Sequence, residues 1–144
     1  MRELFFISIL SFFFCAELQA GDIKHFFSIQ EALGSKEFQG RLNKEIKFYF
    51  GSKPNRRVNK NLGDFVTNKK TNAAFKTDRK ACEWVFLSAL LSLQKRVLAE
   101  GGNAVINIRS FYKKKEMSSK TEFECHVGLL MAGVALKGTV VYLD

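Results

Sequence analysis

A long amphipathic pattern over residues 79–100 predicts one helix that the rest of the 144-residue chain must cover. Apolar side chains recur there at spacings of three, four and seven residues, which places them on one face of an α-helix. Thr77 or Asp78 can cap the start of this helix, and Gly101 with Gly102 can end it in a left-handed turn. The residues on the predicted core face are Cys82, Val85, Phe86, Ala89, Leu90, Leu93 and Val97.

A second apolar stripe lies off the core face of the same helix. Polar residues separate the two on both sides, so we expect the helix to be covered on two sides. Two covers are open: the phenylalanine-rich N-terminal segment can pack there, or the stripe can form an interface with a second copy or another protein. The candidate interface residues are Trp84, Leu87, Leu91 and Leu98.

Alternation of apolar and polar residues predicts the strands of a small sheet. The predicted strands are 45–50, 104–112, 121–127 with a continuation that contains bulges at Gly128 and Gly133, and 139–143. One strand precedes the helix and three follow it, which favours an α+β fold. We expect one long helix packed on a three- to four-stranded, mostly antiparallel sheet.

The connecting segments are less regular than the helix and strands. Residues 52–80 are polar and basic, and they predict a long ordered loop with one short strand near 56–60. Lys137 and Gly138 predict a turn before the final strand. A capping pattern also predicts a short helix around 29–40.

Residues 1–20 have the three-part layout of a secretory signal peptide. Arg2 gives a basic start, an apolar run follows, and Ala20 precedes a cut at Gly21. The apolar run is shorter than the roughly 20 residues that span a bilayer. We therefore expect residues 21–144 to form a single exported domain, periplasmic or secreted, with no stable membrane span after cleavage.

Three cysteines are present, and the predicted cleavage leaves two of them, Cys82 and Cys125. Cys15 follows three phenylalanines instead of the small residue that lipid attachment requires, so we expect a mature protein without a lipid anchor. Cys82 lies on the core face of the predicted helix and Cys125 on the core face of a strand. The two sulfurs can therefore meet in a disulfide, which would contribute about 4 kcal/mol by loop entropy. The alternative is a pair of buried free thiols.

The chain is strongly basic, with 23 Lys and Arg against 14 Asp and Glu and a formal net charge of +9. This balance favours anionic partners through long-range attraction. Residues 53–80 are the candidate site for anionic lipid headgroups, a cell-wall polymer or nucleic acid, and the alternative is a solvated basic face. The candidate anion-binding residues are Lys53, Arg56, Arg57, Lys60, Lys69, Lys70, Lys76, Arg79 and Lys80.

Motifs for catalysis, metal binding or phosphate binding do not stand out. A phosphate loop needs GxxxxGK[ST], and residues 133–139 have those residue types in the wrong order. Cys125 and His126 are adjacent and point to opposite faces of a strand, which predicts a surface histidine and not a metal ligand. We expect a non-enzymatic protein without cofactor or metal, and a hydrolase that uses His126 with Glu124 is the weaker alternative.

A set of short stretches is specific in combination. They are Asn68-Lys69-Lys70-Thr71-Asn72, Ala81-Cys82-Glu83-Trp84, Ser88-Ala89-Leu90, Gly101-Gly102-Asn103-Ala104-Val105, Phe123-Glu124-Cys125-His126 and Ala132-Gly133-Val134-Ala135-Leu136-Lys137-Gly138. In these stretches residues 25–143 resemble a family of small exported proteobacterial proteins that genomes often label as an excinuclease ATPase subunit. The resemblance implies export but no ATPase activity, because the chain has no phosphate loop.

More distantly, the order of helix, glycine, Asn103-Ala104-Val105 and two strands is similar to the YbjQ-like fold. That fold includes the outer-membrane lipoprotein that senses envelope stress for the Rcs phosphorelay. The resemblance implies a disulfide from the helix start to a later strand, at the places of Cys82 and Cys125. It also implies a non-enzymatic envelope protein that acts through protein–protein contacts, as a stress-sensing accessory or a subunit of an envelope assembly. YbjQ-like domains can form rings, so the partner would be an envelope protein or a second copy.

Overall fold

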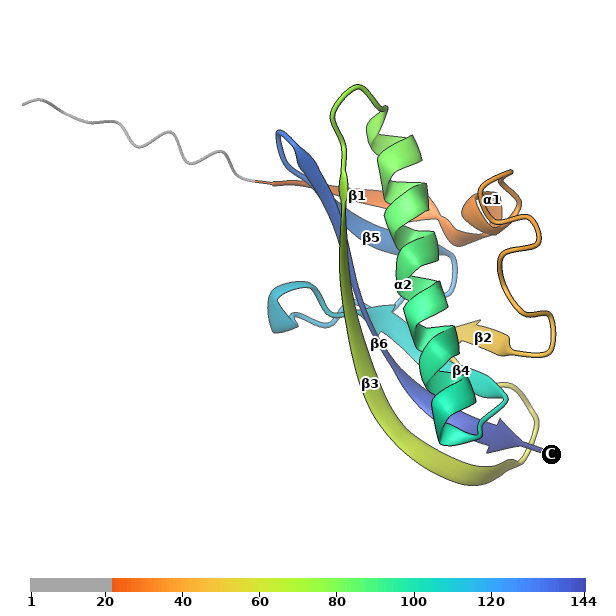
Figure 1. The fold of residues 1–144 in the computed structure, drawn as a ribbon. Helices are drawn as coiled ribbons and strands as arrows, with labels where there is room; N and C mark the ends of the chain where they lie inside the picture. The colour runs from red at the N-terminus through yellow and green to blue at the C-terminus, as the bar shows by residue number, and fades with distance from the viewer. Residues whose placement is uncertain (1–21) are drawn as a thin grey trace, which may run out of the picture.

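A computed structural model describes residues 22–144, and the predicted signal peptide lies outside the described residues. One long helix lies inside the curve of a six-stranded sheet (Figure 1). The strands are β1 (Ile23–Ser28), β2 (Lys47–Phe50), β3 (Val58–Asn72), β4 (Ala104–Ser110), β5 (Glu122–Val127) and β6 (Met131–Leu143). The helices are α1 (Ile29–Leu33), α2 (Asp78–Glu100) and the short 3-10 turn η1 (Tyr112–Lys114).

The long helix α2 follows its local sequence signals closely. Its start is capped by Thr77, whose hydroxyl accepts a hydrogen bond from the Lys80 backbone N–H at 3.2 Å. Its end is Gly101, which takes the left-handed conformation with φ 75°. The predicted core face is buried over its whole length. The prediction of a helix over 79–100 is therefore confirmed to within one residue.

Strand β6 is the centre of the sheet. It pairs with β3 along one edge, and with β5 and then β4 along the other. β4 and β5 thus lie end to end along β6, because residues 111–121 leave the sheet between them. β1 continues the sheet beyond β5, and β2 continues it beyond β4 as a parallel neighbour.

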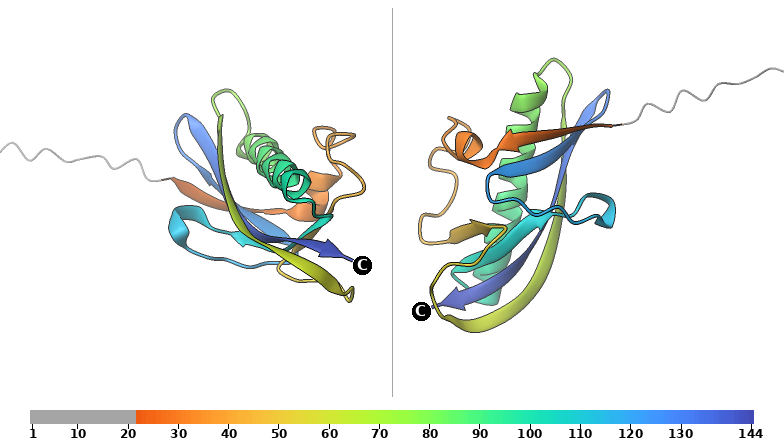
Figure 2. Two further views of the ribbon diagram at one scale, coloured as in Figure 1. Left: turned by 60° about the horizontal axis from the view of Figure 1, so that its bottom comes forward. Right: turned by 180° about the vertical axis from the view of Figure 1, so that it is seen from behind.

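The predicted sheet of three to four mostly antiparallel strands is wrong. The sheet has six strands, includes the parallel β2–β4 pair and curls into a half-barrel around α2 (Figure 2). The main error is β3, which forms a 15-residue strand where the sequence predicts a long loop with one short strand near 56–60. β3 lies at the edge of the sheet and Thr67 is its one buried residue, so its sequence lacks the apolar alternation of a half-buried strand.

The predicted turn at Lys137 and Gly138 is also wrong, because both residues lie within β6. Gly138 is needed there for close packing and not for a turn. A Cβ atom at this position would lie 2.6 Å from Val105 Cγ1 and 3.2 Å from Ile108 Cγ1, both on neighbouring β4. A glycine inside a strand marks a close approach of this kind as well as a turn.

A disulfide between Cys82 and Cys125 joins α2 to β5, with the two Cα atoms 5.9 Å apart. The predicted pairing is thereby confirmed. Beside it, the rings of Phe86 and Phe123 stack with their centroids 4.0 Å apart. The predicted helix around 29–40 is shorter than expected, since α1 ends at Leu33. Within residues 22–144, no helix has the length and apolar character needed to cross a membrane.

Candidate functional sites

The nine predicted anion-binding residues are all exposed, but they do not form one patch. They follow β3 along the length of the molecule (Figure 1) and fall into three groups. Lys53, Arg56, Arg57 and Lys60 lie near the C-terminal end of β6, Lys69 and Lys70 lie in the second half of β3, and Lys76, Arg79 and Lys80 lie where α2 begins.

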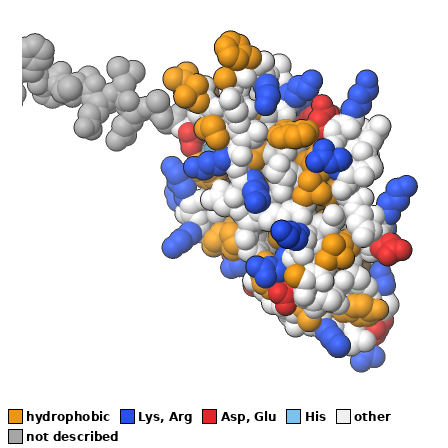
Figure 3. Space-filling view, in the orientation of Figure 1, with side chains coloured by type: hydrophobic (Ala, Val, Ile, Leu, Met, Phe, Trp, Pro, Cys, Tyr) orange, Lys and Arg blue, Asp and Glu red, His pale blue; other side chains and the backbone are white. Residues whose placement is uncertain are grey.

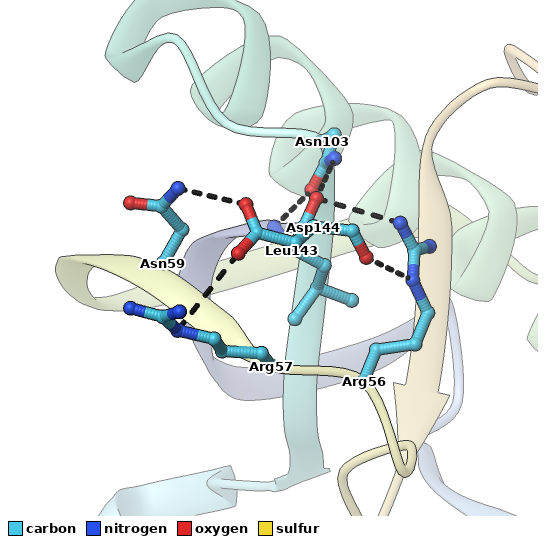
Figure 4. A network of polar contacts seen from close by, with 6 residues as sticks. All are labelled: Arg56, Arg57, Asn59, Asn103, Leu143 and Asp144. Atoms are coloured by element: carbon cyan, nitrogen blue, oxygen red, sulfur yellow. Dashed lines mark hydrogen bonds and ion pairs between the residues drawn. The ribbon is translucent and has the colours of Figure 1, made fainter.

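In the first group, the two arginines hold the end of the chain (Figure 4). Arg56 Nε donates a hydrogen bond of 2.8 Å to the backbone carbonyl of Asp144, and Arg57 Nε lies 3.9 Å from the Asp144 carboxylate. Asn59 donates a third bond of 2.7 Å to that carboxylate. Part of the positive charge of this group is therefore balanced by the Asp144 carboxylate.

In the third group, Arg79 is also engaged within the protein. Its guanidinium lies 2.5 Å from a carboxylate oxygen of Glu31 and 5.3 Å from the centroid of the Phe27 ring. This hydrogen bond and the negative charge of Glu31 raise the pKa of Arg79 further above its usual value. Lys76 bonds through its ammonium group to the Asn72 carbonyl at 3.1 Å. Arg79 thus fastens the start of α2 to α1.

The second group opens onto a groove between β3 and α2, which we call the β3–α2 groove. Two adjoining hollows of about 350 Å³ and about 540 Å³ form it and share Ser92 and Lys95. Its basic residues are Lys69 and Lys70 from β3 and Lys95 and Arg96 from α2, and none of its lining residues is acidic. The face that carries β3 and α2 shows many Lys and Arg side chains (Figure 3).

Lys95 and Arg96 are not predicted from the sequence as site residues, because they lie on the polar side of an amphipathic helix, which resembles an ordinary solvated face. The Arg96 guanidinium lies 4.6 Å from the centroid of the Phe65 ring and 3.4 Å from a Glu100 carboxylate oxygen. Thr67 is buried at the bottom of the groove, and its hydroxyl has no hydrogen-bond partner among the described residues. The groove therefore has cationic side chains from two elements and the buried hydroxyl of Thr67 at its base.

A second polar cluster lies on the opposite face of β5 from the disulfide. His126 Nε2 lies 2.5 Å from a Glu124 carboxylate oxygen, and the Tyr112 ring stacks on the imidazole with a centroid distance of 3.5 Å. Both His126 and Glu124 are buried. The prediction of a surface histidine is wrong, because residues 111–121 fold back over this face of β5. A cavity of about 590 Å³ opens beside the cluster.

The Tyr112 hydroxyl fixes this cover in place. It donates a hydrogen bond of 2.5 Å to Asp22, just before β1. Burial, that hydrogen bond, and the negative charges of Asp22 and Glu124 raise the pKa of Tyr112 to about 12. Between residues 22 and 144, no group of three or more His, Cys, Asp and Glu side chains is placed to hold a metal ion. The cluster's contacts tie the 111–121 segment to β5 and β1.

The candidate interface stripe on α2 is only partly available. Trp84 is 40% exposed and Leu98 is 61% exposed, but Leu87 is 1% exposed and belongs to the core. The assignment of Leu87 to an interface is therefore wrong. The segment between α1 and β2 lies along this side of α2: the Arg41 guanidinium lies 5.6 Å from the centroid of the Trp84 ring, and the Asn43 backbone N–H donates to the Gln94 side chain at 2.7 Å.

Comparison of the chain with protein-family models, with curated proteins and with solved structures gives no match. The two family resemblances of the sequence therefore stay predictions. What the chain does must be argued from its own surfaces.

Proposed function

We propose that this chain is a non-enzymatic, exported envelope protein that binds anionic polymers in the β3–α2 groove. One observation carries the proposal: three lysines and Arg96, which Glu100 pairs from outside the lining, come from two different elements and line a groove that has no acidic lining residue. The net charge of +9 would add a long-range attraction for the same class of ligand.

The shape of the groove suits an extended polymer. Lys69 and Lys70 stand on the long edge strand β3, and Lys95 and Arg96 stand one turn from the end of α2, so the positive charges border a channel and not a closed pocket. Lysine ammonium groups act as point charges without a fixed bonding geometry. We therefore expect binding to depend on charge density more than on the chemistry of the anionic group.

The disulfide supports the exported part of the proposal. Bridges such as Cys82–Cys125 form and persist in oxidising compartments and are rare in the cytosol. The role in protein–protein contacts that the sequence predicts remains a prediction. Trp84 and Leu98 are the exposed members of its candidate interface.

The test is the salt dependence of binding to a heparin oligosaccharide. The variant K69A/K70A/K95A removes three groove charges, and K36A/K44A/K120A removes three exposed lysines outside the groove. If the groove binds, affinity for the unmodified protein falls linearly with salt on a log–log plot, and the groove variant lowers the slope by roughly one per lysine.

The control variant has the same net charge as the groove variant. It should keep most of the slope, because its lysines are not expected to touch the polymer. Equal losses in the two variants would show that the basic surface acts as a whole, and the groove would then not be the site. Binding to the heparin oligosaccharide that does not change with salt concentration would reject the polymer-binding function itself.

A further inference from the structure

Four large apolar side chains stand out from one end of the molecule, and we call them the apolar tip: Phe75, Leu129, Leu130 and Met131. Phe75 is in the loop from β3 to α2, and the other three are at the turn from β5 to β6. The two loops lie side by side, because the Ala73 backbone N–H donates to the Leu130 carbonyl at 2.8 Å. Both form the top of the molecule in Figure 1.

The apolar tip is strongly exposed. Phe75 is fully exposed, Leu129 is 87% exposed and Leu130 is 62% exposed. Large apolar side chains gathered on one surface of a monomer mark an interaction site more often than isolated ones do. Figure 3 shows apolar side chains projecting at this end of the molecule.

Two backbone N–H groups beside the tip are paired within the protein. The Gly128 N–H donates to the Met131 carbonyl at 2.8 Å, and the Ala74 N–H donates to the Asn72 side chain at 2.7 Å. Phe75 has φ 61°, a left-handed conformation that bulky residues rarely adopt, and such conformations cluster at functional sites.

Cations flank the apolar tip. Lys76 and Lys80 line a hollow of about 570 Å³ with Phe75 and Trp84, and Glu37 is its one acidic lining residue. The nearby Asp78 carboxylate is engaged with His25 at 2.9 Å. The apolar tip is therefore flanked by Trp84 and by the ammonium groups of Lys76 and Lys80. Tryptophan and lysine are the residues that lie at the headgroup level of membranes.

We propose that the apolar tip inserts into the surface of a membrane that carries anionic lipids, with Lys76 and Lys80 at the headgroups. Lipid is favoured over a protein partner because the tip is a projection formed by two loop ends, whereas protein interfaces are broader surfaces. The proposal is independent of the β3–α2 groove, since it uses none of the groove lysines. It needs no chemical step, only burial of apolar area and attraction of lysines to anionic headgroups.

The test uses vesicles of phosphatidylcholine with and without phosphatidylglycerol, and the purified, oxidised protein. Trp84 is the only tryptophan of the chain and lies beside Phe75, so its emission reports on the site directly. We expect a blue shift with the anionic vesicles and co-sedimentation of protein with them. The variant F75S/L129S/L130S should lose both, with partitioning weaker by more than about tenfold.

Two controls separate the possible causes. The variant L33S/V66S/L98S removes three exposed apolar side chains elsewhere and should bind vesicles as the unmodified protein does. The groove variant K69A/K70A/K95A should also keep the tryptophan shift, so that failure of the polymer proposal and failure of this one are distinguishable. Since the substituted tip residues are exposed, circular dichroism should show the tip variant folded.

Three outcomes would overturn the proposal. One is the absence of binding to anionic vesicles, and another is equal binding by the tip variant and the unmodified protein. The third is a concentration-dependent increase in mass that the tip variant abolishes, without any vesicle binding, which would assign the tip to self-association. Equal binding to vesicles without phosphatidylglycerol would reject the part assigned to the lysines.

Discussion

At the scale of single residues, Tyr112 shows how one side chain can hold a segment against the sheet. Its ring covers His126, and its hydroxyl bonds to Asp22 on a distant part of the chain. The raised pKa of about 12 means that the folded protein favours the neutral phenol more strongly than water does. Because the folded pKa lies above the ordinary value near 10, the folded state holds this proton more tightly than the unfolded chain.

The predicted consequence is a loss of stability at alkaline pH. The stabilisation from Tyr112 is complete below about pH 10 and falls as the pH rises through about 12. Absorbance at 295 nm should show one of the three tyrosines titrating late, and Y112F should remove that late step. Y142F, which changes an exposed tyrosine, should leave it in place. A late step that persists in Y112F would contradict the assignment.

Residue roles were predictable from the sequence only where the cause was local. Thr77 and Gly101 were identified as helix ends because capping depends on neighbours in the chain. The opposite orientations of Cys125 and His126 also followed from the two-residue period of a strand. The burial of His126 did not, because its cover comes from residues 111–121, and no local pattern reports a segment that folds back from elsewhere.

At the scale of elements, the Cys82–Cys125 disulfide is a covalent cross-link between the helix and the sheet. It joins the first turns of α2 to the middle of β5 and closes a loop with a sequence separation of 43 residues. Most of α2 packs on β3 and β6 without such a link. The bridge therefore fixes the end of the helix that lies nearest to the apolar tip.

Removing the bridge should destabilise the fold without changing it. A loop of this length corresponds to about 4 kcal/mol of unfolding free energy in the chain-entropy account. Urea denaturation of C82A/C125A should show a loss of that order, and the unmodified protein with its bridge reduced should show a similar loss. A midpoint that does not change on reduction would contradict the prediction.

Helices and strands differ in how well each can be predicted from its own sequence. The amphipathic pattern and the capping residues of α2 lie within the helix or directly beside it, so the prediction of this helix is confirmed. The prediction for β3 is wrong because this edge strand carries the exposed charges of Lys60, Lys69 and Lys70. Such charges keep edge strands from pairing with other chains, and they also make the sequence resemble that of a loop. β6 was divided at Gly138, because a glycine chosen for close packing cannot be told from a turn glycine by sequence.

At the scale of the whole molecule, the surfaces are arranged along the length of β3. The bonds to Asp144 lie at one end, the apolar tip at the other, and the β3–α2 groove between them. The sequence predicted the amount of positive charge but not this division, because the groove needs Lys95 and Arg96 to stand opposite Lys69 and Lys70. The number of charged residues can be counted from the sequence, whereas the groove exists only because the fold places β3 and α2 side by side.

The predicted export gives a further test on the whole protein. When the full chain is expressed in a bacterium with an oxidising periplasm, intact-mass analysis should find a species that begins at Gly21. In that species Cys82 and Cys125 should resist alkylation until a reductant is added. A dominant species that keeps Met1, or one with both thiols free, would contradict the prediction.

β6 follows the other five strands in the sequence, and this order determines when the sheet can form. A ribosome-bound chain that still lacks residues 131–143 leaves β3 without its partner strand, and β4 and β5 can then pair only with β2 and β1. The native sheet therefore forms only after residues 131–143 have been synthesised. Such a delay leaves a nascent chain open to translocation across a membrane before it folds.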